Sequence, residues 1–484
     1  MARDLRKEHG RLGEIPTMLE TDYLVIGAGA LGLAFADTLT RESNATVTLA
    51  DRHHTPGGHW NFAYDFVRLH QPSEFYGVES VPLGSGEKDT DGWNSGLYKL
   101  ATGAEVVDYF QTVMSDHLLP SGQVTYFPRT NYLGQGRLKS LETGEEIALN
   151  IRRKIVDATY FGTTIPSLHL PSFQVSPDVH LISPNELSRL LNTAGPEDAD
   201  GVCILGAGKT AMDVGVHLLE SGVPAEQISW VIPRDSWLMN RANLQPGDDF
   251  FESTIGAQAR QMQAFAEAQS AQDLFHRLED AGVMLRIFPE IEPSMFHCAI
   301  ISEGEIELLQ QITQTIRQGH VNSINASGMV LEHGSVPMPA NTVYIDCTAS
   351  AVTRHPQIDI FQDRTITLQI ARACQPAFSA ALIGFIETLD TPDAQKNELC
   401  RPLALPDTLD DYFDITLKNL TNQYVWSRTP EIRDWLKRSR LDGFAARISG
   451  VGQEDANLQA LLQAFRAHTP EAIANIQKMM QRRA

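Results

Sequence analysis

The sequence predicts an α/β protein built on two Rossmann-like units, each made of a buried strand, a glycine turn and a helix. Two observations predict this fold class: a Gly-x-Gly-x-x-Gly segment follows the apolar residues 23–26, and a segment of nearly the same form follows residues 201–205. The length agrees, because 484 residues exceed what one hydrophobic core usually serves. We therefore expect two or three domains.

The first unit begins with residues 23–26, whose apolar side chains suit a parallel strand buried on both faces. Gly27 permits the tight turn, Gly29 lets a pyrophosphate approach the backbone, and Gly32 lets the following helix, residues 30–41, pack on its strand. The positive end of that helix favours phosphate. The next strand ends at Asp51, a carboxylate placed to accept hydrogen bonds from ribose hydroxyls. Together these features predict a dinucleotide site.

The second unit repeats this construction with Gly206 and Gly208, and an alanine stands where the third glycine would be. Lys209 and Thr210 open its helix and are expected at the cofactor's phosphates, with helix capping as the alternative reading. The strand at residues 228–232 leads to Arg234 rather than to an acid. An arginine there suits a 2′-phosphate, so this unit is predicted to bind NADP.

Composition and charge exclude several classes of function. With 42% hydrophobic and 20% charged residues, the chain has the make-up of a soluble enzyme. A net charge of −21 opposes binding to nucleic acid or to anionic lipid. The most apolar long stretch, residues 23–39, is broken by glycines and Asp37, so no membrane span is expected. Residues 1–18 lack the apolar core of a secretory signal and read as an exposed tail, and we expect a cytoplasmic protein.

The cysteines and histidines indicate neither a disulfide framework nor a metal site. The five cysteines are scattered, with no Cys-x-x-Cys pair, and no pair accompanies either glycine turn, which argues against a disulfide reductase. The spacing of the four histidines between residues 53 and 70 matches no metal-binding pattern. The Gly-Lys-Thr letters at residues 208–210 do not form a nucleoside triphosphatase loop, since Cys203 stands where that loop needs glycine.

Directly after Asp51 the chain reads Arg52-His53-His54-Thr55-Pro56-Gly57-Gly58-His59-Trp60. An acid followed by Gly-Gly-x-Trp resembles the class B flavoprotein monooxygenases, which include the flavin-containing and Baeyer–Villiger enzymes. The resemblance implies that the first unit holds FAD, with Asp51 at its ribose. It also implies a cofactor-binding role for Arg52, Gly58, His59 and Trp60.

The following loop, residues 64–76, resembles the Baeyer–Villiger segment that runs under the flavin ring. Arg68, Ser73 and Tyr76 fall on matching positions, and His70 stands where that family has aspartate. The resemblance implies that Arg68, His70 and Gln71 border the ring. An imidazole there could handle protons, or it could be a hydrogen-bonded structural residue of the loop.

The resemblance covers about residues 20–390 and implies a domain plan. Residues 1–165 and 340–400 would form a discontinuous FAD domain, and residues 166–339 an inserted NADPH domain with a helical insertion at about 248–285. Residues 321–336 are predicted to form an antiparallel meander. Residues 401–484 would be a helical C-terminal extension that covers the active site or forms a subunit interface. The sequence therefore allows a homo-oligomer without requiring one.

The resulting hypothesis is a single-component monooxygenase. NADPH would reduce FAD, and a C4a-(hydro)peroxyflavin formed with molecular oxygen would oxidise a small organic substrate. Two departures from the family pattern leave alternatives. Val175 and His180 do not complete Phe-x-Gly-x-x-x-His, and residues 381–385, interpreted as the last flavin-contact strand, lack the usual aspartate. The alternatives are an NADPH-dependent flavin reductase, dehydrogenase or oxidase, and a non-catalytic NADP-sensing protein.

Overall fold

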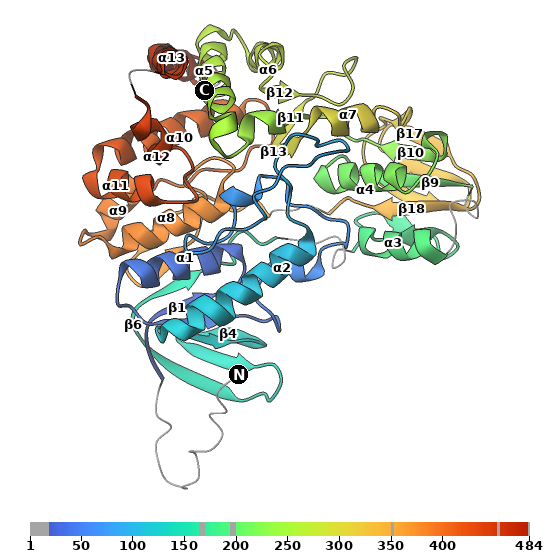
Figure 1. The fold of residues 1–484 in the computed structure, drawn as a ribbon. Helices are drawn as coiled ribbons and strands as arrows, with labels where there is room; N and C mark the ends of the chain where they lie inside the picture. The colour runs from blue at the N-terminus through green and yellow to red at the C-terminus, as the bar shows by residue number, and fades with distance from the viewer. Residues whose placement is uncertain (1–18, 164–169, 194–199, 350–352, 453–454, 483–484) are drawn as a thin grey trace.

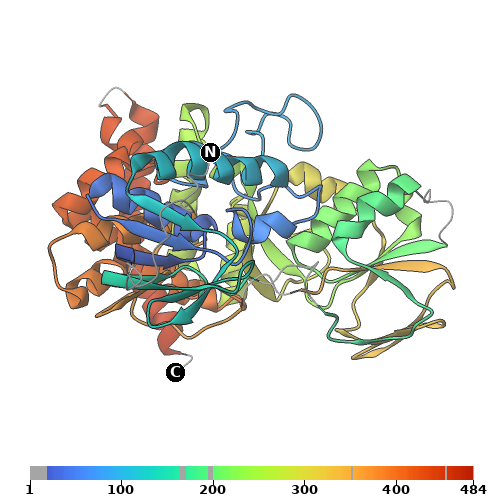
Figure 2. The same ribbon diagram turned by 90° about the horizontal axis from the view of Figure 1, so that it is seen from below.

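The computed structural model describes residues 19–163, 170–193, 200–349, 353–452 and 455–482. The expected N-terminal tail and the expected domain boundary at 165/166 lie outside the described residues. The α/β fold predicted from the two glycine turns is confirmed, because each turn joins a parallel strand to a helix at a different sheet (Figure 1). Figure 2 shows the two sheets on opposite sides of the molecule.

The first sheet contains the first glycine turn. Its main path runs β19-β20-β6-β1-β2-β3, and every pairing along it is parallel except β19 with β20. The hairpin β4-β5 extends from β6. The strands are β1 Leu19–Ile26, β2 Val47–Ala50, β3 Val124–Phe127, β4 Thr130–Gly134, β5 Arg137–Ser140, β6 Glu146–Asp157, β19 Phe361–Gln362 and β20 Thr365–Thr367.

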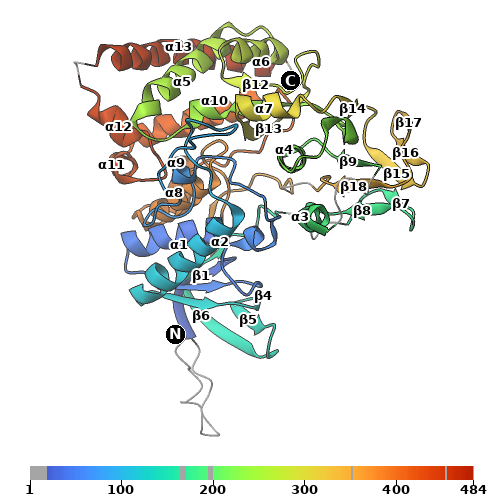
Figure 3. The same cartoon turned by 45° about the vertical axis from the view of Figure 1, so that its right-hand side comes forward.

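Three helices complete the first lobe: α1 (Ala30–Glu42), α2 (Gly103–Thr112) and α8 (Pro376–Thr388). α1 and α8 lie side by side in all views (Figures 1 and 3), and Gly384 allows the contact, since a Cβ there would lie 2.8 Å from the Phe35 carbonyl oxygen. Residues 381–385 are therefore helical, and their interpretation as a strand was wrong. A fully buried apolar run has no periodicity that separates strand from helix, and Pro376 at the start of the run is a helix signal.

The second sheet is entirely parallel, in the order β14-β10-β9-β18-β8. One of its faces is covered by a four-stranded sheet whose β15-β16-β17 part is antiparallel, which confirms the meander expected at residues 321–336. The strands are β7 Gln174–Val175, β8 His180–Ile182, β9 Gly201–Leu205, β10 Ile228–Val231, β14 Gln314–Ile316, β15 Val321–Asn325, β16 Gly328–Leu331, β17 Gly334–Pro337 and β18 Thr342–Asp346. The helices of this lobe are α3 Pro184–Thr193, α4 Lys209–Glu220 and α7 Glu303–Leu309.

A third group of elements joins the middle of the chain to its C-terminal region. The small sheet β12-β11-β13 and helices α5 and α6 share a core with α10 and α13, around Trp237, Phe265, Phe275 and Phe296 (Figure 3). The helices expected at about residues 248–285 and in the C-terminal region are present. The elements of this group are β11 Ser236–Asn240, β12 Met284–Leu285, β13 Met295–Ile301, α5 Phe251–Glu267, α6 Ala271–Asp280, α10 Asp411–Arg428 and α13 Ala456–Gln481. The other C-terminal helices are α9 Asp393–Leu399, α11 Pro430–Arg438 and α12 Ala445–Gly450, and α11 packs in the core of the first lobe.

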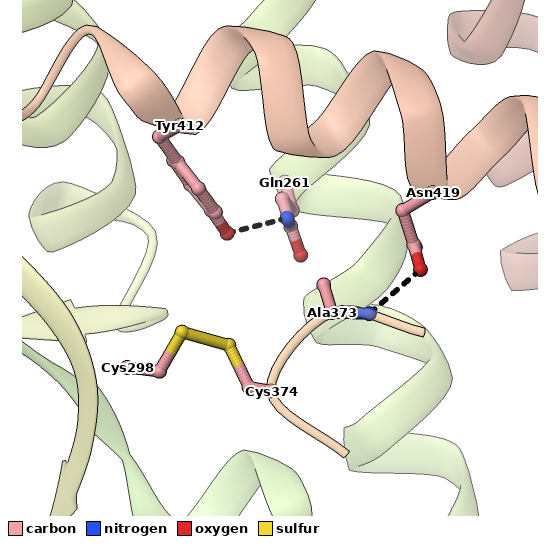
Figure 4. The surroundings of a disulfide bond; sticks show 6 residues. All are labelled: Gln261, Cys298, Ala373, Cys374, Tyr412 and Asn419. Carbon is pink, nitrogen blue, oxygen red and sulfur yellow. Dashed lines mark hydrogen bonds between the residues drawn. A yellow bond between two sulfur atoms is a disulfide. The ribbon is translucent and has the colours of Figure 1, made fainter. Parts of the chain in front are cut away.

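A disulfide joins Cys298 in β13 to Cys374 just before α8 (Figure 4). The expectation of no disulfide was therefore wrong. The two cysteines are 76 residues apart in sequence. β13 also contacts the segment between α9 and α10, where the Phe296 N–H donates to the Asp407 carbonyl. The pair lies at neither glycine turn. Cys203, Cys347 and Cys400 are free and buried.

Among the described residues, the helices are too short or too polar to cross a membrane.

Candidate functional site

The backbone of the first glycine turn requires glycine at Gly27 and Gly32. Gly27 has a φ of +102°, a backbone conformation that favours glycine. A Cβ on Gly32 would lie 1.9 Å from the Gly27 carbonyl oxygen, so only glycine lets α1 start where it does. Gly29 is the N-cap of α1 and no side chain caps the helix there. The first N–H groups of α1 thus have no side-chain acceptor, which fits a phosphate at this position.

Asp51 is buried at the end of β2 and holds this turn in place. Its Oδ2 accepts a hydrogen bond from the Ala28 N–H at 2.6 Å, and its Oδ1 accepts one from the His53 N–H at 2.7 Å. Arg52 is exposed, with Nε 3.3 Å from His53 Nε2. Asp51 therefore organises the turn that the sequence assigns to FAD, in addition to its predicted contact with ribose.

The Gly-Gly-His-Trp loop lies against the second glycine of the turn. A Cβ on Gly58 would be only 3.1 Å from the Gly29 Cα, and Gly58 itself has a φ of +59°. Trp60 Nε1 donates a hydrogen bond to the Tyr76 hydroxyl at 2.8 Å, which ties this loop to the segment that follows it. Burial lowers the pKa of His59 to about 4, so its imidazole is neutral at pH 7.

The second glycine turn combines one crowded glycine with one open glycine. Gly206 has a φ of +114°, and a Cβ there would lie 2.7 Å from the Cys347 carbonyl oxygen. Gly208, the N-cap of α4, has no heavy atom within 4 Å of the position a Cβ would take, among the described residues, and no side chain caps the helix. Free space beside uncapped N–H groups is what the approach of a pyrophosphate requires.

Lys209 and Thr210, predicted at the phosphates, make contacts within the protein. The Lys209 ammonium is buried against the Asp213 carboxylate one helical turn away, and it lies 3.5 Å from Glu305 Oε1. The Thr210 hydroxyl is hydrogen-bonded to the Tyr64 hydroxyl. In this conformation both side chains serve the boundary between the two lobes.

Arg234, predicted at the 2′-phosphate, is exposed beyond the end of β10. Its Nη2 lies 3.2 Å from Asp407 Oδ1, and Arg354 Nη2 lies 3.2 Å from the same oxygen. His297 Nε2 is 2.7 Å from it as well. Two arginines thus share one carboxylate.

A cavity of about 240 Å³ separates the loops after the first glycine turn from α4 of the second lobe. Arg68 and His70 line it, whereas Gln71 does not and instead donates through Nε2 to the Phe75 carbonyl at 3.2 Å. The structure therefore brings together two of the three residues predicted at the flavin ring. The charged and imidazole side chains of the wall are Asp65, Arg68, His70, Lys209, Asp213, His217, Glu220, Arg241 and Glu305.

Asp213 is the centre of the polar network on this wall. Its Oδ2 accepts a hydrogen bond from the Tyr64 hydroxyl at 2.7 Å and lies 3.6 Å from His70 Nε2. Burial acts to raise the pKa of Asp213, but the Lys209 ammonium and His70 outweigh it and hold this pKa well below its usual range. Asp213 is therefore ionised at pH 7.

His70 faces this carboxylate as a neutral imidazole. Burial, assisted by the charges of Lys209 and Arg241, lowers the pKa of His70, and Asp213 only partly opposes the shift. A neutral imidazole with one nitrogen toward a carboxylate leaves its other nitrogen able to accept a proton.

Sequence reasoning missed three members of this network: Asp213, Arg241 and Glu305. The spacing of Lys209 and Asp213, four residues apart at the start of a predicted helix, could have indicated an ion pair. Glu305 belongs to a Ser-x-x-Glu capping box with Ser302, which predicts a helix start but no site. Arg241 carries no sequence signal.

Comparison with known proteins agrees with this description. The NAD(P)-binding Rossmann-like domain family matches residues 25–70, which contain the first glycine turn, Asp51 and the Gly-Gly-His-Trp loop. The uncharacterized proteins Mb2023 of Mycobacterium bovis and Rv2000 of Mycobacterium tuberculosis are each 43% identical over 462 residues, which is 96% of this chain and 85% of the relative.

Among solved structures, the ε-caprolactone-bound cyclohexanone monooxygenase in the Loose conformation is 13% identical, with a TM-score of 0.50 over 86% of this chain and 98% of that chain. The polycyclic ketone monooxygenase from the fungus Thermothelomyces thermophila is 12% identical, with a TM-score of 0.49 over 95% of this chain and 90% of that chain. The chain therefore has the fold of the cyclohexanone monooxygenase, and it belongs to the same family as the mycobacterial proteins Mb2023 and Rv2000.

Proposed function

We propose that the protein is an FAD- and NADPH-dependent oxidoreductase, and that it acts as a monooxygenase on a small organic substrate with molecular oxygen as the second substrate. The observation that carries the proposal is the pair of glycine turns at uncapped helix N-termini, closed by an acid in one unit and by an arginine in the other. Two such turns in one chain serve two different dinucleotides.

FAD fits the first unit. Gly29 leaves room at the N-terminus of α1, and Asp51 stands at the end of β2, where an acid recognises ribose. A 2′-phosphate would meet the negative charge of Asp51, so this unit suits the adenosine half of FAD better than that of NADPH.

NADPH fits the second unit. Gly208 faces open space at the start of α4, and the two guanidinium groups of Arg234 and Arg354 share the single carboxylate of Asp407. The positive charge left over is available to a phosphate.

Bound FAD would supply a ring that accepts hydride from the nicotinamide and, when reduced, reacts with oxygen. Residues of the chain line the cavity beside this ring and determine its charge. Asp213 orients His70 through Nε2 and is itself held by Tyr64 and Lys209. His70, neutral at pH 7, can accept a proton from substrate at its other ring nitrogen and return it.

A second candidate is an NADPH-dependent oxidase or reductase that does not transfer oxygen to a substrate. It is favoured by the charged wall of the cavity, because ionised side chains hold water and oxygen transfer needs a water-poor pocket. Val175, which replaces the glycine of the family's pattern, lies in β7 and pairs with Ile324 in the meander.

The test begins with the visible spectrum of the purified protein and with its oxidation of NADPH and NADH. A yellow protein should oxidise NADPH in preference to NADH, and Arg234→Ala should weaken NADPH much more than NADH. A colourless protein that takes up no FAD would refute the proposal, and steady NADPH consumption above the free-flavin background would exclude a purely sensing role. Mixing the reduced protein with oxygen separates the two candidates: stoichiometric hydrogen peroxide with no oxygenated product identifies the oxidase.

A further inference from the structure

Arg241 is a buried cation on the cavity wall, and among the described residues one of its three guanidinium nitrogens has partners. It follows β11 and is 1% exposed. Its Nη1 donates to Asn94 Oδ1 and forms an ion pair with Glu305 Oε2 at 2.7 Å. Its Nε and Nη2 have no hydrogen-bond partner among the described residues. Buried donors without partners are rare and costly, and a charged one is more costly than a neutral one.

The unpaired atoms lie on the same edge of the guanidinium group. Nε and Nη2 present two parallel N–H bonds, the arrangement that matches the two oxygens of a carboxylate. The opposite nitrogen, Nη1, is fixed by Asn94 and Glu305, so the group is already oriented before a ligand arrives.

The cavity wall carries three cations, Arg68, Lys209 and Arg241, and four carboxylates, Asp65, Asp213, Glu220 and Glu305. Lys209 is balanced by Asp213 and Glu305, and Glu305 is shared with Arg241. Arg68, on the same wall, is exposed and donates to the Leu100 carbonyl at 3.3 Å, and its charge acts on Glu220 without a close ion pair among the described residues. Asp65 is exposed and accepts a hydrogen bond from Ser188, and burial raises the pKa of Glu220, a shift that the charge of Arg68 opposes.

The cavity is large enough for a small organic ligand, with a volume of about 240 Å³. A wall this polar does not favour a purely hydrocarbon ketone.

We propose that this cavity binds a small substrate that carries a carboxylate, held by the Nε and Nη2 edge of Arg241 with Arg68 as the second cationic contact. That the ligand is a substrate rests on the proposed function. The inference adds that this substrate is a carboxylic acid rather than a neutral ketone.

The test compares carboxylates with neutral molecules of the same shape on the full-length protein carrying its flavin. Benzoate, phenylacetate and hexanoate are titrated beside benzamide, phenylacetamide and hexanamide, with binding measured by calorimetry and by perturbation of the visible spectrum, in the absence of NADPH. We expect the carboxylates to bind at least about tenfold more tightly than their amides. Equal binding of acids and amides, or no binding of any acid at about 10 mM, would overturn the proposal.

Variants locate the binding site. Arg241→Gln should remove the preference for the acid, and Arg241→Lys should retain part of it. Because Arg241 is buried and pairs with Glu305, its replacement could unfold the protein, so the exposed Arg68→Gln provides a second variant that should weaken acid binding severalfold without loss of folding. Arg137 on β5 forms an exposed ion pair with Glu146, so Arg137→Gln is the matched control and should bind the acids as the unaltered protein does. An acid preference that survives both Arg241→Gln and Arg68→Gln would place the ligand elsewhere and refute the assignment.

The two proposals fail separately. If the protein binds acids but does not oxidise NADPH, the proposed function is contradicted and the carboxylate site is supported. If it oxidises NADPH rapidly but shows no preference for acids, the carboxylate site is contradicted and the proposed function is supported.

Discussion

His70 Nε2 lies 3.6 Å from Asp213 Oδ2, so the loop that follows the first Rossmann-like unit meets the helix of the second across a shared cavity. The Asp213 carboxylate favours the protonated form of His70. Burial and the charges of Lys209 and Arg241 disfavour that form. The balance between these groups decides the pH range in which the imidazole can accept a proton.

The first prediction concerns Asp213→Asn. Loss of the carboxylate should lower the pKa of His70 further, because burial and the nearby cations then act unopposed. If neutral His70 is required, activity is lost as the pH falls through its pKa, so the acid limb of kcat/KM for NADPH oxidation should move to lower pH. His70→Asn, which has no titrating ring, should lack this limb. An unchanged pH profile in Asp213→Asn would show that the pair does not govern the reaction.

The second prediction compares two glycines of one turn. Gly206→Ala should destabilise the protein by about 2 kcal/mol or more, since its φ of +114° and the Cys347 carbonyl 2.7 Å from a new Cβ leave no room for relaxation. Gly208→Ala should change the free energy of unfolding by less than about 0.5 kcal/mol, because its Cβ meets open space. The same methyl group should weaken NADPH binding at least about tenfold by occupying the place of the pyrophosphate.

Urea unfolding and NADPH titration measure these two effects independently. If Gly208→Ala binds NADPH with full affinity, the pyrophosphate does not bind at this turn.

These turns are also where the sequence predicted the structure best. Gly27, Gly32 and Gly206 are required by the backbone itself, through positive φ or through contacts that a Cβ would break, so their pattern carries the geometry directly. The strands and helices beside them followed from short apolar runs of ordinary length. α8 was missed because every face of its central residues is buried, which removes the periodicity that identifies a helix.

The polar network was predicted only in part, because its members come from separate segments. His70, Lys209, Arg241 and Glu305 belong to a loop, two helices and a short helical turn, and nothing local to any one of them indicates the others. The Cys298–Cys374 pair was missed for the same reason. Contacts of this kind depend on how the lobes pack together, and no local pattern in a single sequence indicates that packing.

The third prediction concerns stability at low pH. Burial lowers the pKa of His59 to about 4, whereas an unfolded chain titrates near 6.5. The folded state therefore binds fewer protons, so His59 contributes full stability above about pH 6.5 and loses it as the pH falls toward 4. Between pH 7.5 and pH 5 the loss should be about 2 kcal/mol. Urea unfolding at both pH values should show this loss reduced in His59→Gln, and an equal loss in both proteins would contradict the assignment.

The fourth prediction concerns the disulfide. Cys298 and Cys374 close a chain segment of 76 residues, so the oxidised protein should be more stable than the reduced protein by about 2 to 4 kcal/mol. Comparison of urea midpoints with and without dithiothreitol measures the difference, and Cys298→Ala should abolish it. Thiol titration of the unfolded, unreduced chain should find the three free cysteines, Cys203, Cys347 and Cys400. Five reactive thiols would mean that the bond does not form.

The last prediction uses the carboxylate shared by Arg234 and Arg354. In the absence of a phosphate, Asp407 accepts contacts from both guanidinium groups at 3.2 Å and from His297 at 2.7 Å. A 2′-phosphate must compete with Asp407 for these cations and also meets its negative charge. Asp407→Asn should therefore lower the KM for NADPH by about threefold while the KM for NADH stays nearly constant, and the gain should shrink at high salt, since both arginines are exposed. Steady-state kinetics with both nucleotides at low and high ionic strength provide the measurement. A higher KM for NADPH would mean that Asp407 positions the arginines rather than competing with the phosphate, whereas an equal change for NADH would place the cluster away from the 2′-position.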